Sequence, residues 1–115
     1  MAMTTISEKA TLLTFINVFT VRPENQDLLV ELLTQATDVS VRYAKGFVSS
    51  ALHRSLDGTK VTMYAQWQSM EAYQAMRGDP AASPYLTKAL TIATFEAGAY
   101  EVIKTFTSEV QDGAP

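Results

Sequence analysis

Apolar residues alternate in some segments of the chain and follow helical spacing in others. Residues 11–21 (TLLTFINVFTV) are β-branched and aromatic, with apolar side chains on both alternating faces, which is typical of a strand covered on two sides. After this strand, Pro23 and Glu24 indicate a helix start, because proline suits the first turn and the helix dipole favours a carboxylate there. Leucines at three- and four-residue steps then predict a long amphipathic helix that reaches about Tyr43.

The middle of the chain predicts an antiparallel hairpin. Residues 47–55 and 60–67 both have the composition of strands. The short segment between them centres on Asp57 and Gly58, a dipeptide that favours a tight turn.

The last third of the chain predicts two more helices and a final strand. Ser69 is a good N-cap for a short second helix, and Ser83 followed by Pro84 begins a third. We expect the helical region to end at Gly98. A fourth strand should then cover residues 99–106 (AYEVIKTF), where apolar and polar residues alternate again.

This order of elements, β-α-β-β-α-α-β, predicts an α+β fold of the ferredoxin-like kind. In the split βαβ arrangement, four strands form one antiparallel sheet with the helices on one face, and here the second crossover is divided into two helices. We assign residues 11–106 to this single domain. Residues 1–10 and 107–115 are small, polar and acidic, which indicates frayed tails.

The sheet face turned away from the helices is the reason to expect a second subunit. No helix is left to cover it, and it should consist of Thr14, Ile16, Val18, Thr20, Val48, Ser50, Leu52, Tyr64 and Gln66. Isologous contacts are the commonest way in which soluble chains associate. The partly apolar surface therefore predicts a homodimer in which two sheets enclose a barrel-like interior, a dimeric α+β barrel.

Composition excludes several classes of function. The chain has 115 residues and a formal net charge of -3, and its Lys and Arg residues are scattered, so we expect no nucleic-acid partner. It has no cysteine, and its one histidine, His53, lacks a cluster of carboxylates, so we expect no metal site. Neither a signal peptide nor a membrane-length apolar run is visible, which favours a cytoplasmic protein with no membrane partner.

Candidate site residues lie on the strand faces that should meet the helices. Odd-numbered positions of the first and third strands should point inward, since Phe15 and Phe19 fit a covered core. Asn17, Met63 and Trp67 share these faces. A buried amide without partners costs about 1–3 kcal/mol, so the asparagine must contact either a neighbouring loop or a ligand.

Aromatic and cationic side chains extend this candidate cleft. Trp67 ends its strand just before the second helix, on which Tyr73 and Met76 follow. Either ring can be plain core or pocket wall, and the Tyr73 hydroxyl can donate a proton or a hydrogen bond. Arg77 could hold an anionic group, although an exposed arginine at a helix end is the simpler account.

Seven short motifs occur in an order and spacing that are specific when taken together. They are residues 15–19 (FINVF), 21–23 (VRP), 46–47 (GF), 52–55 (LHRS), 57–59 (DGT), 64–67 (YAQW) and 72–73 (AY). In this order, over about residues 12–106, the chain resembles the antibiotic biosynthesis monooxygenase family. Members of that family are dimeric α+β barrels, and they include the cofactor-free monooxygenase of the actinorhodin pathway.

The resemblance implies an activity: oxidation of an electron-rich phenol, anthrone or hydroquinone to a quinone by dioxygen, with no metal, flavin or other cofactor. It implies that Trp67 packs against the substrate, that Tyr73 donates to a developing oxyanion or peroxide, and that Asn17 is a polar contact. The residues left to bind the aromatic substrate are Phe15, Phe19, His53, Met63, Met76 and Arg77. The oxygenases most like this chain carry asparagine at the position of Met63. Since methionine cannot hold a keto or hydroxyl group, either Asn17 replaces that asparagine or the chemistry differs.

Two other functions fit the same fold. A dimeric binding protein for a hydrophobic small molecule needs no general base, and Met63 and Met76 would suit its pocket equally well. An isomerase or decarboxylase needs a carboxylate or a histidine inside the pocket. His53 would supply that base only if it points inward, alongside Phe47 and Ala51.

Overall fold

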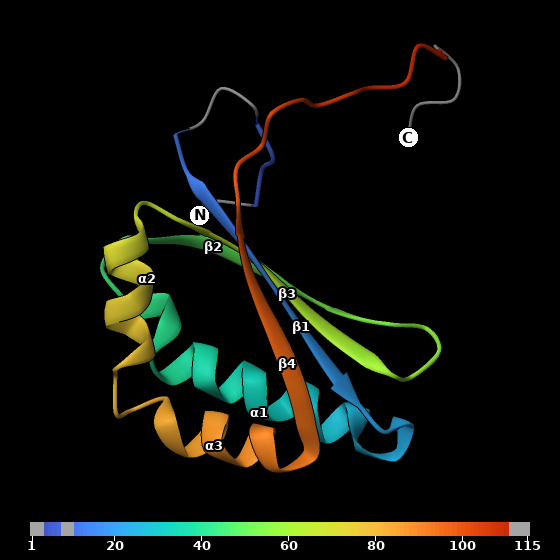
Figure 1. The fold of residues 1–115 in the computed structure, drawn as a ribbon, viewed down its shortest axis with the longest axis vertical. Coiled ribbons are helices and arrows are strands. Elements are labelled where there is room, and N and C mark those ends of the chain that lie inside the picture. The colour runs from blue at the N-terminus through green and yellow to red at the C-terminus, as the bar shows by residue number, and fades with distance from the viewer. Residues whose placement is uncertain (1–3, 8–10, 111–115) are drawn as a thin grey trace.

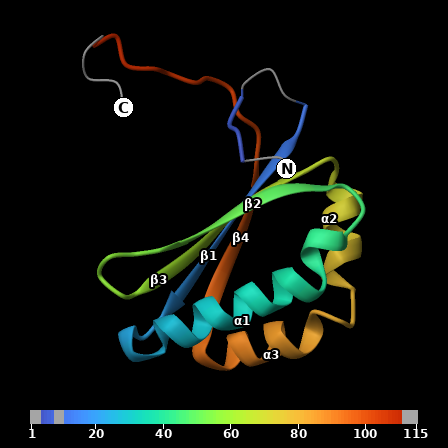
Figure 2. The same cartoon turned by 180° about the vertical axis from the view of Figure 1, so that it is seen from behind.

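The structure, a computed structural model, describes residues 4–7 and 11–110. Its strands form one antiparallel sheet in the order β2-β3-β1-β4, and its helices lie on one face of that sheet (Figure 1, Figure 2). The strands are β1 (Leu13–Val21), β2 (Phe47–Arg54), β3 (Lys60–Trp67) and β4 (Ala93–Tyr100), and the helices are α1 (Gln26–Val39), α2 (Met70–Arg77) and α3 (Ser83–Ile92). The predicted ferredoxin-like α+β fold is confirmed.

Two neighbouring hydrophobic clusters fill the space between the sheet and the helices. One surrounds Leu29 and Val61, which have no exposed surface, and joins α1 and α3 to the sheet. The other surrounds Phe15, Trp67 and Tyr73 and joins α2 to the other end of the sheet. The inward orientation expected for odd-numbered residues of β1 and β3 is confirmed by these contacts.

The final strand does not lie where the alternation placed it. We expected helix up to Gly98 and a strand over residues 99–106, whereas α3 ends at Ile92 and β4 runs from Ala93 to Tyr100 beside β1. Gly98 therefore belongs to a strand. A Cβ there would lie 2.6 Å from the Tyr100 ring, so the glycine leaves room for its neighbour's side chain and does not stop a helix.

A bulge in β2 changes which of its residues face the helices. The register shifts between Phe47 and Ser49, which leaves one residue of the strand unpaired. Beyond the bulge, Ser50 and Leu52 face the helices, and His53 lies exposed on the opposite face. The expectations that Ser50 and Leu52 lie on the open face and that His53 points inward are therefore wrong, because one extra residue exchanges the two faces of a strand.

The sheet face turned away from the helices is called the outer face. It consists of Thr14, Ile16, Val18, Thr20, Ser49, Ala51, His53, Thr62, Tyr64, Gln66, Thr94, Glu96, Gly98 and Tyr100. The N-terminal residues 4–7 lie against it, since the Gln66 Nε2 donates a hydrogen bond to the Thr5 carbonyl oxygen at 2.6 Å. This part of the expected N-terminal tail thus contacts the domain; residues 1–3 and 8–10 of that tail, and 111–115 at the other end, lie outside the described residues.

The turn between β2 and β3 depends on the Asp57 carboxylate. Its Oδ1 accepts hydrogen bonds from the Thr59 and Ser55 hydroxyls, both at 2.7 Å, and from the Thr59 backbone N–H at 3.0 Å. The hydrogen bonds from Thr59 and Ser55, together with the charge of Lys60, lower the pKa of Asp57 from 3.8 to about 2. Since the pKa is lower in the folded state, the stability from this carboxylate is present above pH 3.8 and is lost as the pH falls through about 2.

Asp57→Asn should therefore lower the melting temperature modestly at pH 7, because the turn loses its charged acceptor. The difference from the parent chain should shrink as thermal scans are repeated at decreasing pH and should disappear below pH 2. A difference that stays constant over this range would mean that the carboxylate charge contributes nothing to the turn.

Candidate active site

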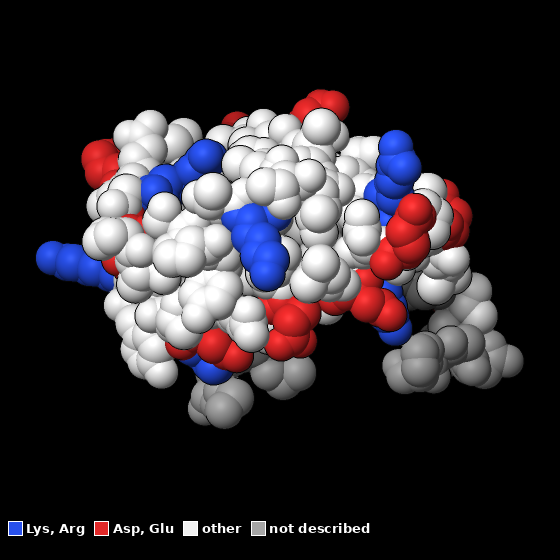
Figure 3. All heavy atoms as spheres, turned by 90° about the horizontal axis from the view of Figure 1, so that it is seen from below, with Lys and Arg blue, Asp and Glu red and all other residues white. Residues whose placement is uncertain are grey.

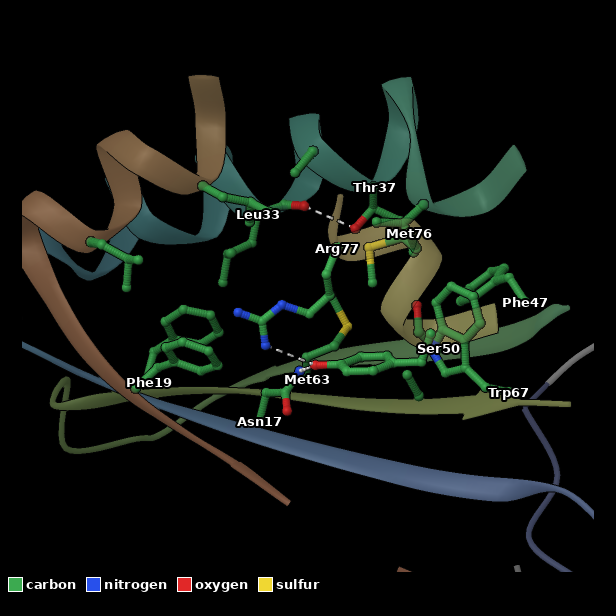
Figure 4. A pocket seen from close by; sticks show the side chains of 17 residues that line it. Asn17, Phe19, Leu33, Thr37, Phe47, Ser50, Met63, Trp67, Met76 and Arg77 are labelled. Carbon is green, nitrogen blue, oxygen red and sulfur yellow. Dashed lines mark hydrogen bonds between the residues drawn. The ribbon is translucent and has the colours of Figure 1, made fainter. Parts of the chain in front are cut away.

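A cavity lies between the sheet and the helices, where the two hydrophobic clusters meet (Figure 4). Every strand and all three α-helices contribute side chains to its lining. Its volume is about 110 Å³, several times the ~10–15 Å³ that one water molecule requires on the same measure. Most of the lining is apolar, and the polar side chains in it are Asn17, Thr37, Ser50, Tyr73 and Arg77. An apolar cavity with a few convergent polar groups is typical of a small-molecule site.

The Tyr73 ring is fixed by other aromatic rings. It stacks on Phe15 with the ring centroids 3.9 Å apart and the planes 13° from parallel, and it meets Trp67 edge-on at 5.7 Å. Trp67 in turn meets Phe47 edge-on at 5.2 Å. Tyr73 itself lines the cavity, and its hydroxyl contacts Asn17 and Arg77, two other lining residues.

The Tyr73 hydroxyl oxygen accepts hydrogen bonds from the Asn17 Nδ2 and the Arg77 Nη1, both at 3.4 Å. These bonds are longer than the usual 2.7–3.2 Å or so, and they leave the tyrosine's own proton available for a ligand. The Asn17 Oδ1 is buried and has no partner among the described residues. Turning the amide over would exchange its oxygen and nitrogen, so one of the two polar atoms is left unpaired in either orientation.

The Arg77 guanidinium lies at the same point of the cavity. Its central carbon is 5.9 Å from the centroid of the Tyr73 ring and 5.5 Å from that of Phe95. The side chain comes from the last residue of α2 and its head points toward the sheet (Figure 4). A hydroxyl, an amide and a guanidinium therefore converge in an otherwise apolar space.

Most of the candidate residues line the cavity, and two do not. Those that line it are Asn17, Phe19, Met63, Trp67, Tyr73, Met76 and Arg77. Phe15 lies behind the Tyr73 ring, where it supports the site without forming its wall. The prediction that His53 contacts the ligand is wrong, because the bulge in β2 places this residue on the outer face.

Among the lining residues that were not predicted as site residues, three have an identifiable reason. Phe95 fell in a segment assigned to helix, and it stacks on Phe19 across the β1–β4 pair with centroids 5.0 Å apart. Ser50 was assigned to the wrong face of β2. Thr37 looked like an ordinary helix residue, and its hydroxyl donates to the Leu33 carbonyl in the preceding turn. The spacing of Thr37 from Leu33, one turn earlier on α1, was the one available signal for it.

Neither a metal-binding cluster nor a membrane-spanning helix is found in the described part of the chain. No group of three or more His, Asp or Glu side chains in residues 4–7 and 11–110 is placed to hold a metal ion. None of the helices in those residues is long and apolar enough to cross a membrane. On the side of the molecule that Figure 3 shows, Lys and Arg are spread singly and intermingled with acidic residues.

The fold and the cavity define a small-molecule-binding α+β protein of the ferredoxin-like kind. Residues 12–85 match the family model described as antibiotic biosynthesis monooxygenase. The chain is also 38% identical, over 112 residues, to the tetracenomycin-F1 monooxygenase of Streptomyces glaucescens, a match that covers 97% of this chain and 100% of that protein. The chain therefore belongs to the antibiotic biosynthesis monooxygenase family.

Solved structures of similar fold agree with this assignment. SnoaB from Streptomyces nogalater, described as a cofactor-independent oxygenase, superposes with a TM-score of 0.66 at 23% identity and covers 86% of this chain and 100% of its own. A putative antibiotic biosynthesis monooxygenase from Nitrosomonas europaea has a TM-score of 0.72 at 12% identity, covering 83% and 93%. At these identities the likeness concerns the fold.

Proposed function

We propose that this chain is a cofactor-independent monooxygenase that oxidises an electron-rich aromatic compound, a phenol, anthrone or hydroquinone, to a quinone with dioxygen. The observation that carries the proposal is the Tyr73 hydroxyl, which contacts the Asn17 amide where both residues line a mostly apolar cavity. The monooxygenase relative, named for its action on tetracenomycin F1, supports the reaction class. No carboxylate or histidine is among the residues that line the cavity, which disfavours an isomerase or decarboxylase.

The residues of the cavity fit the steps of this reaction. For an anthrone, the ionised ring system gives one electron to dioxygen, and the two radicals join in a carbon–peroxide bond. The O–O bond then breaks: one oxygen becomes the quinone carbonyl, the other leaves as water, and the carbon loses both of its hydrogens. Tyr73 donates to the peroxide as negative charge develops on it, Asn17 holds a ring oxygen, and the aromatic wall around Trp67 excludes water.

Met63, which stands where similar oxygenases carry asparagine, lines this cavity. The unpaired amide atom of Asn17 lies on the neighbouring strand, since residues 17 and 63 are directly opposite in the β1–β3 pair. This supports the alternative in which Asn17 takes over the polar contact that a methionine cannot make.

Oxygen uptake tests the proposal directly. Protein stripped of metal and flavin is offered anthrones, naphthols and hydroquinones, and oxygen consumption is measured with quinone formation. We expect uptake above the rate of autoxidation, with one quinone formed per dioxygen consumed when an anthrone is the substrate. Binding of these compounds with uptake no faster than in buffer would replace the proposal with a non-catalytic binding protein.

We also propose that two copies pair through the outer face. Ile16, Val18 and Tyr64 form the middle of that face, and no helix of the described residues covers them. Residues 101–110 extend beyond the domain after β4 (Figure 1, Figure 2), and Ile103 and Phe106 in them are 82% and 86% exposed. A second copy of the chain would bury both the face and the apolar side chains of this extension.

The mass in solution should accordingly be twice the 12.6 kDa of one chain. Ile16→Lys places a charge between Tyr64 and Gly98 in the middle of the outer face and should convert the protein to monomers, as measured by light scattering after gel filtration. Thr20→Lys, at the exposed end of the same strand and face, is the matched control and should remain dimeric. A monomeric parent chain at micromolar concentration would rule the dimer out.

A further inference from the structure

Arg77 is the only charged side chain among the residues that line the cavity. The ion pairs of the described residues join Arg42 to Asp38 and Arg54 to Asp27, and Arg77 takes part in none. An arginine that water reaches needs no counter-ion, but a guanidinium that is taken out of water without one is costly. A ligand that fills the cavity and displaces water from Arg77 is therefore favoured if it supplies an anion.

The contacts that Arg77 does make leave most of its hydrogen-bonding capacity free. A guanidinium has five N–H donors, and the one directed at the Tyr73 hydroxyl spans 3.4 Å. The rings of Tyr73 and Phe95 lie near the planar head, with their centroids 5.9 and 5.5 Å from its central carbon, and such contacts favour its position without neutralising it. The head is thus positioned, and its remaining donors can turn to a ligand.

The surroundings indicate which part of a ligand would lie there. Arg77 as a whole is exposed and also lines the cavity, so its side chain lies where the cavity opens to solvent. Phe47, Met63 and Trp67 line the space with apolar surface. An aromatic ring system would occupy that space and present an oxygen to Arg77, and the Asn17 amide, which also lines the cavity, offers a second polar group.

We propose that Arg77 makes this cavity selective for ionised aromatic ligands, with its guanidinium binding an anionic oxygen that is either a phenolate or a carboxylate substituent. Charge-assisted hydrogen bonds are roughly twice as strong as neutral ones, and the planar fork of arginine matches two oxygens at once. That the ligand is a substrate rests on the proposed function; the binding preference itself does not. Selection of the ionised form would give the oxygenase the electron-rich species that reacts with dioxygen.

The test measures binding without turnover, by calorimetric titration with oxygen removed. Two matched ligand pairs are used: 2-naphthoate with its methyl ester, and a nitronaphthol with its methyl ether. The nitronaphthol absorbs differently when ionised, so its spectrum reports the charge state in which it is bound. The protein variants are Arg77→Gln and Arg77→Lys, and the control is Arg42→Gln, which removes the arginine of the exposed Asp38–Arg42 ion pair outside the cavity.

We expect the parent chain to bind at least one anion ~10-fold or more tightly than its neutral partner. This ratio should fall to near one in Arg77→Gln, remain in part in Arg77→Lys, and be unchanged in Arg42→Gln. Selectivity within the naphthoate pair assigns a carboxylate, and selectivity within the nitronaphthol pair, with the ionised spectrum in the complex, assigns a phenolate.

The proposal is overturned if the parent chain prefers neither anion, if neither binds at millimolar concentration, or if the preference survives Arg77→Gln. The binding test needs no oxygen, so its result is independent of the oxygen-uptake assay. If the chain prefers an anion but takes up no oxygen, the anion site stands and the proposed oxygenase activity is wrong. If it takes up oxygen but prefers neither anion, the activity stands and the proposed role of Arg77 is wrong.

Discussion

Tyr73→Phe should lower the rate of oxygen uptake by about 100-fold, the usual effect of removing a donor to developing negative charge. The melting temperature should change little, because the phenylalanine ring keeps the stacking contact with Phe15 and the edge contact with Trp67. Within the described residues, the hydroxyl oxygen accepts only two long hydrogen bonds, from Asn17 and Arg77. The measurement is kcat from an oxygen electrode, beside a thermal scan of each protein.

Tyr85→Phe is the matched control for this variant. Tyr85 packs against the α1–α3 cluster and does not line the cavity, so removal of its hydroxyl should leave the rate unchanged. A Tyr73→Phe protein with the parent rate would show that the hydroxyl is no part of the chemistry. The oxygenase would then depend on the substrate's own ionisation alone.

Trp67→Ala should lower the free energy of unfolding by about 3–5 kcal/mol, the usual cost of deleting a large buried aromatic ring. Trp67 is 1% exposed and is among the largest fully buried side chains of the described residues. Its removal would also leave Phe47 and Tyr73 without their shared edge contact. Urea denaturation monitored by circular dichroism gives the value.

Met76→Ala serves as the comparison, since Met76 lines the same cavity but is only half-buried. This substitution should lower the free energy of unfolding by less than Trp67→Ala does. If Trp67→Ala costs less than about 1 kcal/mol, the neighbouring rings must collapse into the space. The expected loss also means that Trp67→Ala cannot separate binding from folding. Trp67→Phe, which keeps part of the packing, is the variant to use in activity assays.

The elements that the sequence predicted well have local signals. The leucine spacing of α1, the Asp57-Gly58 turn and the Ser69 cap, whose side chain accepts from the Ala72 backbone N–H, depend on neighbours within a few residues. β4 has no such signal. Residues 91–95 (TIATF) continue a helical pattern, and only pairing with β1 makes residues 93–95 part of a strand.

The candidate site likewise has residues that local patterns place correctly and residues that depend on distant strand pairing. The parity of β1 and β3 placed Asn17, Met63 and Trp67 correctly, because a regular strand preserves its alternation over its whole length. His53 was misplaced because the bulge lies at Val48, an apolar residue that fits either face and so hides the shift. The contact of Phe95 with Phe19 could not be read from the chain, since it depends on the register of two strands far apart in sequence.

The cavity is built from every strand and all three α-helices, so it exists only when the whole domain is folded. Binding is then linked to global unfolding: a ligand at 100 times its dissociation constant adds about 2.7 kcal/mol to stability. For a domain of this size, that corresponds to a rise of roughly 10 °C in the melting temperature. The physiological ligand can thus be sought in a metabolite library by measuring melting temperatures, with no knowledge of the reaction and no need for turnover.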